Sequence, residues 1–205
     1  QQLTQRLRQR AASAGQTLSP DQMKQVQSLL NRYFGKPPSD GSPDWQKIAA
    51  AITLLKQLCI ISGAPGTGKT TTVAKFLGVL IQWTQETPLR IHLCAPTGKA
   101  AARLGASLSD ASLSMDCPPS VAAALAKLDT STIHRLLRPQ PGGRAFVFNA
   151  RNPLPTDVVV VDEASMVDLV LMDRLVQAVP KEARLGILGD KDQLASVEAG
   201  AVFGD

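Results

Sequence analysis

The segment Gly63–Thr70, with the sequence GAPGTGKT, constrains the fold of this chain more than any other feature. It has the spacing G-x-x-x-x-G-K-S/T, and it lies between an apolar run at 58–62 and an amphipathic run at 68–83. A strand, this loop and a helix in that order form the context in which the loop wraps around phosphate groups. We therefore expect a phosphate-binding loop at the carboxyl end of a strand.

The residue types in the loop suit a polyphosphate. Glycines let backbone amides point at the phosphates, and the helix that follows adds the partial positive charge of its N-terminus. Lys69 is expected to reach the β- and γ-phosphates, and Thr70 to offer its hydroxyl to magnesium. The alternative is a glycine-rich turn that binds nothing, which the matching context disfavours. The predicted nucleotide-binding residues here are Gly63, Ala64, Pro65, Gly66, Thr67, Gly68, Lys69, Thr70 and Thr71.

Strand-like and helix-like segments alternate around this loop and predict an α/β fold. The four valines at 158–161 are typical of a strand buried on both faces, as in a parallel sheet with helices on both sides. An aromatic content of 4% also suits this architecture better than a β-sandwich. The expected strands are 58–62, 90–95, 158–162 and 184–188, and the expected helices are 68–83, 98–108 and 169–179.

Residues 1–43 are expected to form a small helical lead-in and a linker. Ser19 has the position of a helix N-cap, and apolar residues then recur at helical spacing to about Phe34. The Pro- and Gly-rich stretch at 35–43 ends this helix. We therefore expect the main domain to occupy residues 44–205.

The segment 109–155 interrupts the alternation within the main domain. It contains paired prolines, an alanine-rich helix near 121–128, a short turn at 132–137 and a Pro/Gly-rich loop. We expect it to leave the sheet, and long departures of this kind often carry function.

Two carboxylates, Asp162 and Glu163, follow the valine run directly. Because parallel strands end at one edge of a sheet, we expect these side chains beside the phosphate loop. Asp162 would help to hold magnesium, and Glu163 would orient or activate the attacking water during hydrolysis. Gln193 follows the next strand and is expected to sense the γ-phosphate. Each pattern alone is common on protein surfaces, and its combination with the loop favours the catalytic interpretation.

Two further segments carry hydroxyls, helix starts and cations that suit nucleic-acid phosphates. One follows the expected strand at 90–95, and the other lies inside 109–155. A histidine such as His134, flanked by apolar residues, is often only structural, and His92 inside a strand is expected to be structural. The candidate nucleic-acid-binding residues are Thr97, Lys99, Arg103, Thr132, His134 and Arg135.

Charge is unevenly distributed along a chain whose net charge is +5. Bases exceed acids between residues 90 and 151, whereas acids exceed bases from residue 152 onward. This distribution suits a protein that holds a phosphate backbone on one surface and a metal cation at another. Ordinary solvated charge explains the same counts about equally well.

The three cysteines, Cys59, Cys94 and Cys117, are odd in number and lack C-x-x-C spacing. We therefore expect neither a disulfide framework nor a zinc site. No apolar run approaches the ~20 residues of a membrane span, and the N-terminal segment lacks the apolar core of a signal peptide. The expectation is a soluble protein of a reducing cytoplasm.

Motifs I, Ia, Ib, II and III of superfamily 1 helicases resemble, in order, GAPGTGKTTT, APTGKAAARL, STIHRLL, VVVVDEASMVDL and LGDKDQLASVEAGAVFGD. Within that superfamily the chain is similar to the RecD-like family, that of the exodeoxyribonuclease V alpha subunit, over residues 20–205. The resemblance implies a P-loop NTPase (RecA-like) fold that binds ATP and Mg²⁺. It also implies a 5′-to-3′ helicase on single-stranded DNA, with RecB-like and RecC-like subunits, in double-strand break repair and recombination.

The same resemblance adds Gln46, which matches the position where such helicases place a glutamine that reads adenine. Motifs IV, V and VI, with the arginine finger and the second motor domain, have no counterpart in these 205 residues. We therefore expect the fragment to bind nucleotide but to turn it over poorly, because an arginine finger contributes on the order of 10³–10⁵ in rate.

Other functions stay open from the sequence. One is a stand-alone RecD-like helicase, and another is a nucleotide-binding scaffold without motor activity. A nucleotide or small-molecule kinase also uses a phosphate loop. It needs a lid with arginines and an acceptor pocket, whereas this chain concentrates its basic residues between 90 and 151.

Overall fold

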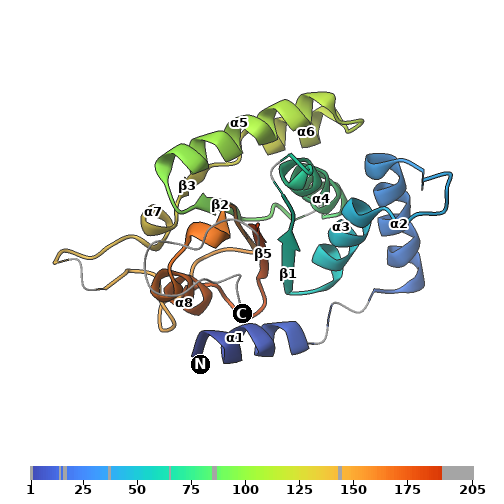
Figure 1. Cartoon of the computed structure of the whole chain (residues 1–205). Helices are drawn as coiled ribbons and strands as arrows, with labels where there is room; N and C mark the ends of the chain where they lie inside the picture. Colours follow the sequence, from blue (N-terminus) through green and yellow to red (C-terminus); the bar gives the residue numbers. More distant parts are fainter. Residues whose placement is uncertain are drawn as a thin grey trace.

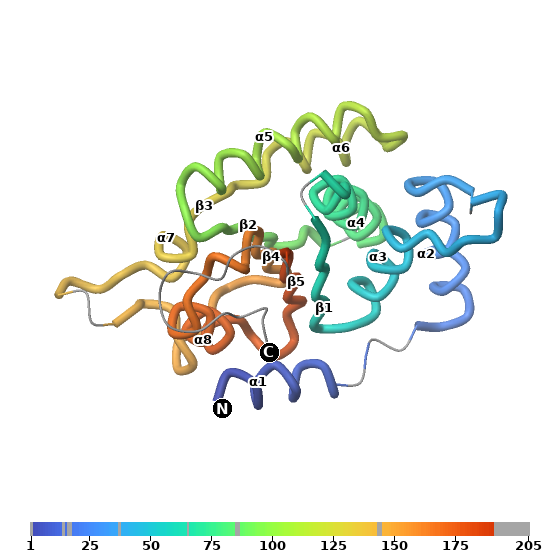
Figure 2. The backbone as a smooth tube through the Cα atoms, in the orientation of Figure 1, coloured from blue at the N-terminus to red at the C-terminus, as the bar shows by residue number. Residues whose placement is uncertain are grey.

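The computed structural model describes residues 2–13, 15, 18–36, 38–64, 66–84, 87–142 and 145–190. Within this part of the chain a five-stranded sheet has the order β1-β5-β4-β2-β3, and every neighbouring pair is parallel (Figure 1; β4 is labelled in Figure 2). This confirms the predicted α/β class with a parallel sheet. The strands are β1 (Leu58–Ser62), β2 (Ile91–Ala95), β3 (Thr130–Thr132), β4 (Val158–Val161) and β5 (Arg184–Gly189).

The four valines of β4 show that both faces of the sheet are covered. Val158 and Val160 belong to one buried hydrophobic cluster, whereas Val159 and Val161 belong to another. Successive side chains of a strand point to opposite faces, so an all-valine strand needs a helical layer on each side.

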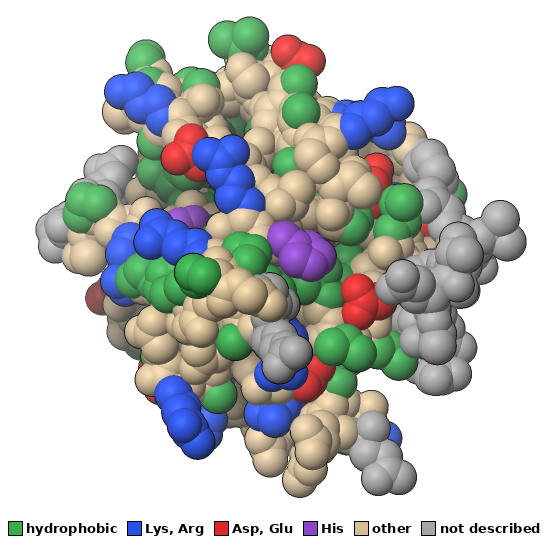
Figure 3. Space-filling view, turned by 90° about the vertical axis from the view of Figure 1, so that its left-hand side faces the viewer, with side chains coloured by type: hydrophobic (Ala, Val, Ile, Leu, Met, Phe, Trp, Pro, Cys, Tyr) green, Lys and Arg blue, Asp and Glu red, His purple; other side chains and the backbone are tan. Residues whose placement is uncertain are grey.

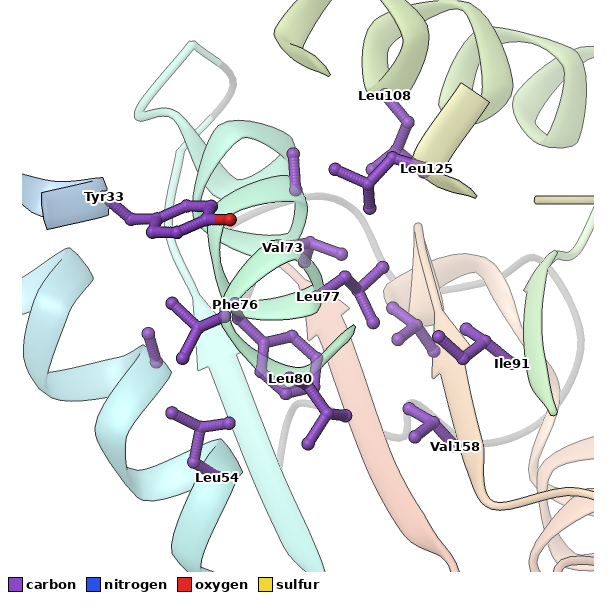
Figure 4. Close-up of a cluster of buried hydrophobic side chains, with 14 of the residues drawn as sticks. Tyr33, Leu54, Val73, Phe76, Leu77, Leu80, Ile91, Leu108, Leu125 and Val158 are labelled. Carbon is purple, nitrogen blue, oxygen red and sulfur yellow. The ribbon is translucent and has the colours of Figure 1, made fainter. Parts of the chain in front are cut away.

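The first layer is centred on α4, which follows the phosphate loop. Its residues Phe76, Leu77 and Leu80 are buried among side chains from the neighbouring helices and the sheet (Figure 4). Tyr33 of α2 reaches this cluster and donates a hydrogen bond of 2.8 Å to Oε1 of Gln82. The helices of this layer are α2 (Pro20–Phe34), α3 (Trp45–Leu55), α4 (Lys69–Trp83), α5 (Gly98–Ser114) and α6 (Pro119–Ala126).

The second layer covers the opposite face with α1 (Gln2–Ala12), α7 (Ile133–Leu137) and α8 (Leu169–Ala178). Leu3 and Leu7 of α1 pack against its buried cluster, and the smooth backbone trace shows α1 passing close to α8 and β1 (Figure 2). The helices before residue 44 therefore join both layers: α1 lies against β1 and α8, whereas α2 packs on α3 and α4. A domain boundary at 43/44 stays a prediction.

Most elements agree with the sequence-based bounds to within one residue, but three features were not predicted. The α5 helix continues six residues past Leu108, to Ser114. Helix α1 was not specified within the lead-in. The segment 109–155 also returns to the sheet through β3, whose polar sequence Thr-Ser-Thr lacks an apolar strand pattern and which pairs with β2 at the sheet edge.

Cys59 and Cys94 are buried free thiols, and burial raises the pKa of Cys94 to about 12. In the described part of the chain, no group of three or more His, Cys, Asp or Glu side chains is arranged to hold a metal ion. No described helix is both long enough and apolar enough to span a bilayer.

Candidate functional site

A cavity of about 380 Å³ lies where β1, β5 and β4 end, three strands that are neighbours in the sheet. The phosphate loop supplies one side of it, and the residues after β4 and β5 supply another. The predicted loop and the predicted carboxylates are therefore brought together. The charged and hydroxyl side chains around the cavity include Lys69, Thr70, Arg103, Asp162, Glu163 and Asp190.

The loop has the backbone conformation that its glycines allow. Gly66 and Gly68 both have a φ of 80°, in the left-handed region where other residues are strained. Lys69 donates hydrogen bonds through Nζ to the carbonyls of Gly63 and Ala64, the latter at 3.1 Å. The ammonium group thus lies against the first residues of the loop.

Gln46 of α3 contacts the same loop. Its Nε2 donates a hydrogen bond of 3.1 Å to the carbonyl of Thr67, and it lies so close to Gly68 that an added Cβ there would be 2.6 Å away. The helix start that presents Gln46 is fixed by Asp44, whose side chain accepts a hydrogen bond from the amide of Lys47. The structure therefore places Gln46 at the phosphate loop.

Asp162 and Glu163 leave the end of β4 with an unusual backbone. Glu163 has a φ of 51°, and its amide donates a hydrogen bond of 2.9 Å to Oδ1 of Asp162. The amide of Asp162 is tied to the carbonyl of Cys94 on β2 at 2.9 Å. Non-glycine residues with positive φ are uncommon and often occur at functional sites.

The two segments predicted to contact nucleic acid lie side by side at the same edge of the sheet. Ala95 at the end of β2 is paired with Thr132 at the end of β3. Thr97 and Thr132 are both helix N-caps. The Thr97 hydroxyl accepts a hydrogen bond from the amide of Ala100, and the Thr132 hydroxyl accepts one from the amide of Arg135. Both hydroxyl oxygens are thus used to cap the N-terminus of a helix.

The cations and the histidine of these segments are accessible. Lys99, His134 and Arg135 are exposed, and the His134 ring lies 5.8 Å from that of Phe146, centroid to centroid. Figure 3 shows the side of the molecule with α7 and α8, where Lys and Arg side chains lie among hydrophobic ones and near histidine. His92, by contrast, is half-buried in β2, and burial lowers its pKa, as suits a structural residue.

Some residues depart from the predicted grouping. Arg103 was grouped with Thr97 and Lys99 but lines the cavity beside the phosphate loop. Phe148 was not among the predicted site residues, although the Arg138 guanidinium lies over its ring at 5.3 Å from the centroid. The Phe-Val-Phe run after the Pro/Gly-rich loop was the only signal for it. Pro65 and Gln193 fall outside the described residues.

Comparison with known proteins identifies the family of this chain. The sequence profile of the AAA domain family matches residues 46–199. This range contains the phosphate loop, both carboxylates and both segments predicted to bind nucleic acid. The chain belongs to the AAA domain family. The T4 UvsW helicase has a similar fold, with a TM-score of 0.56 at 14% identity over 86% of this chain and 62% of the UvsW chain. The predicted P-loop NTPase fold is thereby confirmed.

Curated relatives confirm the RecD-like resemblance. The chain is 45% identical over 184 residues to the RecBCD enzyme subunit RecD of Haemophilus influenzae, covering 88% of this chain. It is 48% identical over 165 residues, or 79% of its length, to the subunit of the same name from Mycobacterium tuberculosis. The ATP-dependent RecD2 DNA helicase of Deinococcus radiodurans is 36% identical over 192 residues, covering 86% of this chain. The chain spans 28%, 28% and 24% of these relatives.

Proposed function

We propose that this AAA-family chain is the nucleotide-binding motor domain of a RecD-type, ATP-dependent DNA helicase. One observation carries the proposal: a single cavity brings Lys69 and Thr70 of the loop together with Asp162 and Glu163 of β4. A glycine-rich turn without function would not require two carboxylates, one on a residue in a left-handed conformation, at the end of a strand two positions away in the sheet.

The cavity residues fit ATP with Mg²⁺. Backbone amides of the loop and Lys69 would hold the β- and γ-phosphates, and Thr70 with Asp162 would hold the cation. When bound, Mg²⁺ neutralises phosphate charge and orients the oxygens. Glu163 would position the attacking water and accept its proton. Gln46, which contacts the loop at Thr67, would bind the adenine. Gln193 keeps its proposed role as a γ-phosphate sensor.

Single-stranded DNA would bind at the adjacent edge formed by the ends of β2 and β3. Lys99 and Arg135 offer cations to its phosphates, His134 offers an imidazole, and the helix starts capped by Thr97 and Thr132 present amides. Because nucleotide and DNA would bind at one edge of one sheet, hydrolysis in the cavity would drive movement of the strand. The RecD-type assignment makes that movement 5′ to 3′.

The names of the RecD relatives favour one biological setting for this chain, a RecBCD-type complex in double-strand break repair and recombination, with RecB-like and RecC-like partners. The RecD2 relative favours a second candidate, a helicase that works alone. Tagged full-length protein purified from its own cells separates the two. Stoichiometric RecB-like and RecC-like subunits support the complex, whereas a monodisperse active monomer supports the stand-alone helicase.

The central experiment measures ATP hydrolysis by the full-length protein with and without single-stranded DNA. Wild type, Lys69→Ala and Lys127→Ala are compared, because Lys127 is an exposed lysine remote from the cavity. DNA-stimulated hydrolysis that only Lys69→Ala abolishes supports the motor. Hydrolysis indifferent to DNA would contradict it and favour the kinase alternative, and nucleotide binding without any hydrolysis would favour the scaffold.

A further inference from the structure

Arg103 of α5 lies on a wall of the nucleotide cavity. Leu104 and Ser107 of the same helix also line the cavity, so the second and third turns of α5 form that wall. Arg103 and Ser107 are four residues apart, which places both on one face of the helix. The phosphate loop and the strand ends therefore do not enclose the cavity by themselves.

Close packing fixes this wall in position. Leu104 and Leu108 are 2% and 1% exposed within the cluster around α4. On another side, α5 approaches β3 so closely that a Cβ added to Gly105 would lie 3.1 Å from Oγ1 of Thr130. A helix held by a buried face and by the sheet edge presents Arg103 from a defined backbone position.

The charged side chains that line the cavity indicate which kind of ligand group Arg103 would bind. Among the described residues that line the cavity, only Lys69 and Arg103 have cationic side chains, against the carboxylates of Asp162, Glu163 and Asp190. Lys69 is hydrogen-bonded to loop carbonyls. Within the described part of the chain, Arg103 makes no ion pair or hydrogen bond with any of the three carboxylates. Its guanidinium is thus available to an anion in the cavity.

We propose that Arg103 binds the terminal phosphate of the nucleoside triphosphate, with the Ser107 hydroxyl as a second donor. The inference rests on the proposed function and refines it, since Arg103 had been grouped with the DNA-binding residues. A guanidinium matches phosphate oxygens with two parallel donors, which a lysine does not. The terminal phosphate is the part bound because Arg103 shares its cavity with Lys69 and Glu163, which are proposed to hold the γ-phosphate and the attacking water, whereas Gln46, proposed to bind the adenine, does not line that cavity.

The test is equilibrium binding by the full-length protein, which needs no turnover. A fluorescent non-hydrolysable ATP analogue, fluorescent ADP and single-stranded DNA are each titrated into wild type, Lys69→Ala, Arg103→Ala, Arg103→Lys and Lys99→Ala. Lys99 is the matched control, because it lies one turn earlier on α5 and does not line the cavity. Thermal melts of all variants accompany the titrations, and exposed Arg103 predicts unchanged folding.

We expect Arg103→Ala to weaken binding of the ATP analogue on the order of 10- to 100-fold, the cost of losing one charged hydrogen-bonding group. Binding of ADP and of DNA should change by less than about threefold, and Arg103→Lys should recover only part of the loss. Lys99→Ala should weaken DNA binding and leave nucleotide binding unchanged.

An equal loss for ADP would overturn the assignment to the terminal phosphate. Weakened DNA binding with unchanged nucleotide binding would return Arg103 to the DNA edge and refute the inference. Failure of the proposed function gives a different result, because wild type and Lys69→Ala would then bind the ATP analogue equally poorly.

Discussion

The amide of Glu163 donates a hydrogen bond of 2.9 Å to Oδ1 of Asp162, while Glu163 itself has a left-handed φ of 51°. A conformation of this kind costs about 1–3 kcal/mol in a non-glycine residue and persists only where the surroundings impose it. Here the next two residues, Ala164 and Ser165, are buried, and the amide of Asp162 is bound to β2. The strain therefore lies at the residue proposed to position the attacking water.

Glu163→Gln should separate hydrolysis from nucleotide binding in the full-length protein. The amide keeps the size of the side chain but cannot accept a proton, so we expect kcat to fall on the order of 10²–10⁴-fold. Affinity for ATP should stay within about twofold, because Lys69 and the loop are unchanged. Steady-state hydrolysis and equilibrium binding measure the two effects, with exposed Glu182→Gln as the control. Unchanged kcat would remove Glu163 from its proposed role.

Glu163→Gly should stabilise the fold although it removes the carboxylate. Glycine adopts positive φ without steric cost, so we expect a gain of about 1 kcal/mol in the free energy of unfolding. For a chain of this length that corresponds to a melting temperature about 2–4 °C higher. Glu163→Ala is the matched comparison, since it loses the same carboxylate but keeps the strain. Equal melting temperatures for the Gly and Ala variants would show that the backbone relaxes without cost.

Gly68→Ala tests the contact between the phosphate loop and α3. An alanine there has an unfavourable φ of 80°, and its Cβ would lie 2.6 Å from Nε2 of Gln46. We expect ATP affinity to fall at least tenfold, as Gln46 and the loop are pushed apart. Gly98→Ala is the control, because its φ is ordinary and a Cβ there meets nothing within 4 Å. The double variant with Gln46→Ala should recover only the part of the loss that comes from the clash.

The sequence predicted the elements whose pattern is local. The valine run of β4 and the glycine loop carry their own signals, and their joint position at one sheet edge follows from parallel topology. β3 was missed because its strand character comes from pairing with β2 rather than from its three polar residues. Tertiary context of this kind overrides residue preference.

The candidate site was predictable to a similar degree. Lys69 and Asp162 belong to two different motifs, and both line one cavity, as the parallel topology led us to expect. The place of Arg103 was not predictable, because it depends on which face of α5 packs on α4 and β3, and the motif places Arg103 close to Lys99 in sequence. Gln193 stays a prediction.

Asp157 should contribute stability that depends on pH. Its carboxylate accepts hydrogen bonds from Nη2 of Arg90 at 2.8 Å and from the Arg90 amide at 2.8 Å, and these hold the pKa of Asp157 below its usual value. Because the folded-state pKa is depressed, the stabilisation is complete above the unfolded pKa of about 3.9 and is lost as pH falls through the lower folded value. Wild type should therefore exceed Asp157→Asn in urea-unfolding free energy at pH 7, and the difference should shrink as the pH falls below the unfolded pKa of about 3.9. In an Arg90→Ala background, most of this pH dependence should disappear; its persistence would assign it to another group.

Arg10 should be a principal anchor of α1. It is 7% exposed and donates hydrogen bonds to the carbonyls of Val179, Pro180 and Ala183, the last two at 2.9 and 3.3 Å. Burial lowers the pKa of Arg10, so these acceptors must offset the lost hydration of the guanidinium. Arg10→Ala should cost about 2–3 kcal/mol and lower the melting temperature by about 5–10 °C, since it removes the side-chain donors to the carbonyls after α8. Arg8→Ala, an exposed arginine of the same helix, should melt within about 1 °C of wild type. If both variants melt alike, Arg10 does not hold α1 on the sheet, and the apolar contacts of Leu3 and Leu7 would be its main attachment.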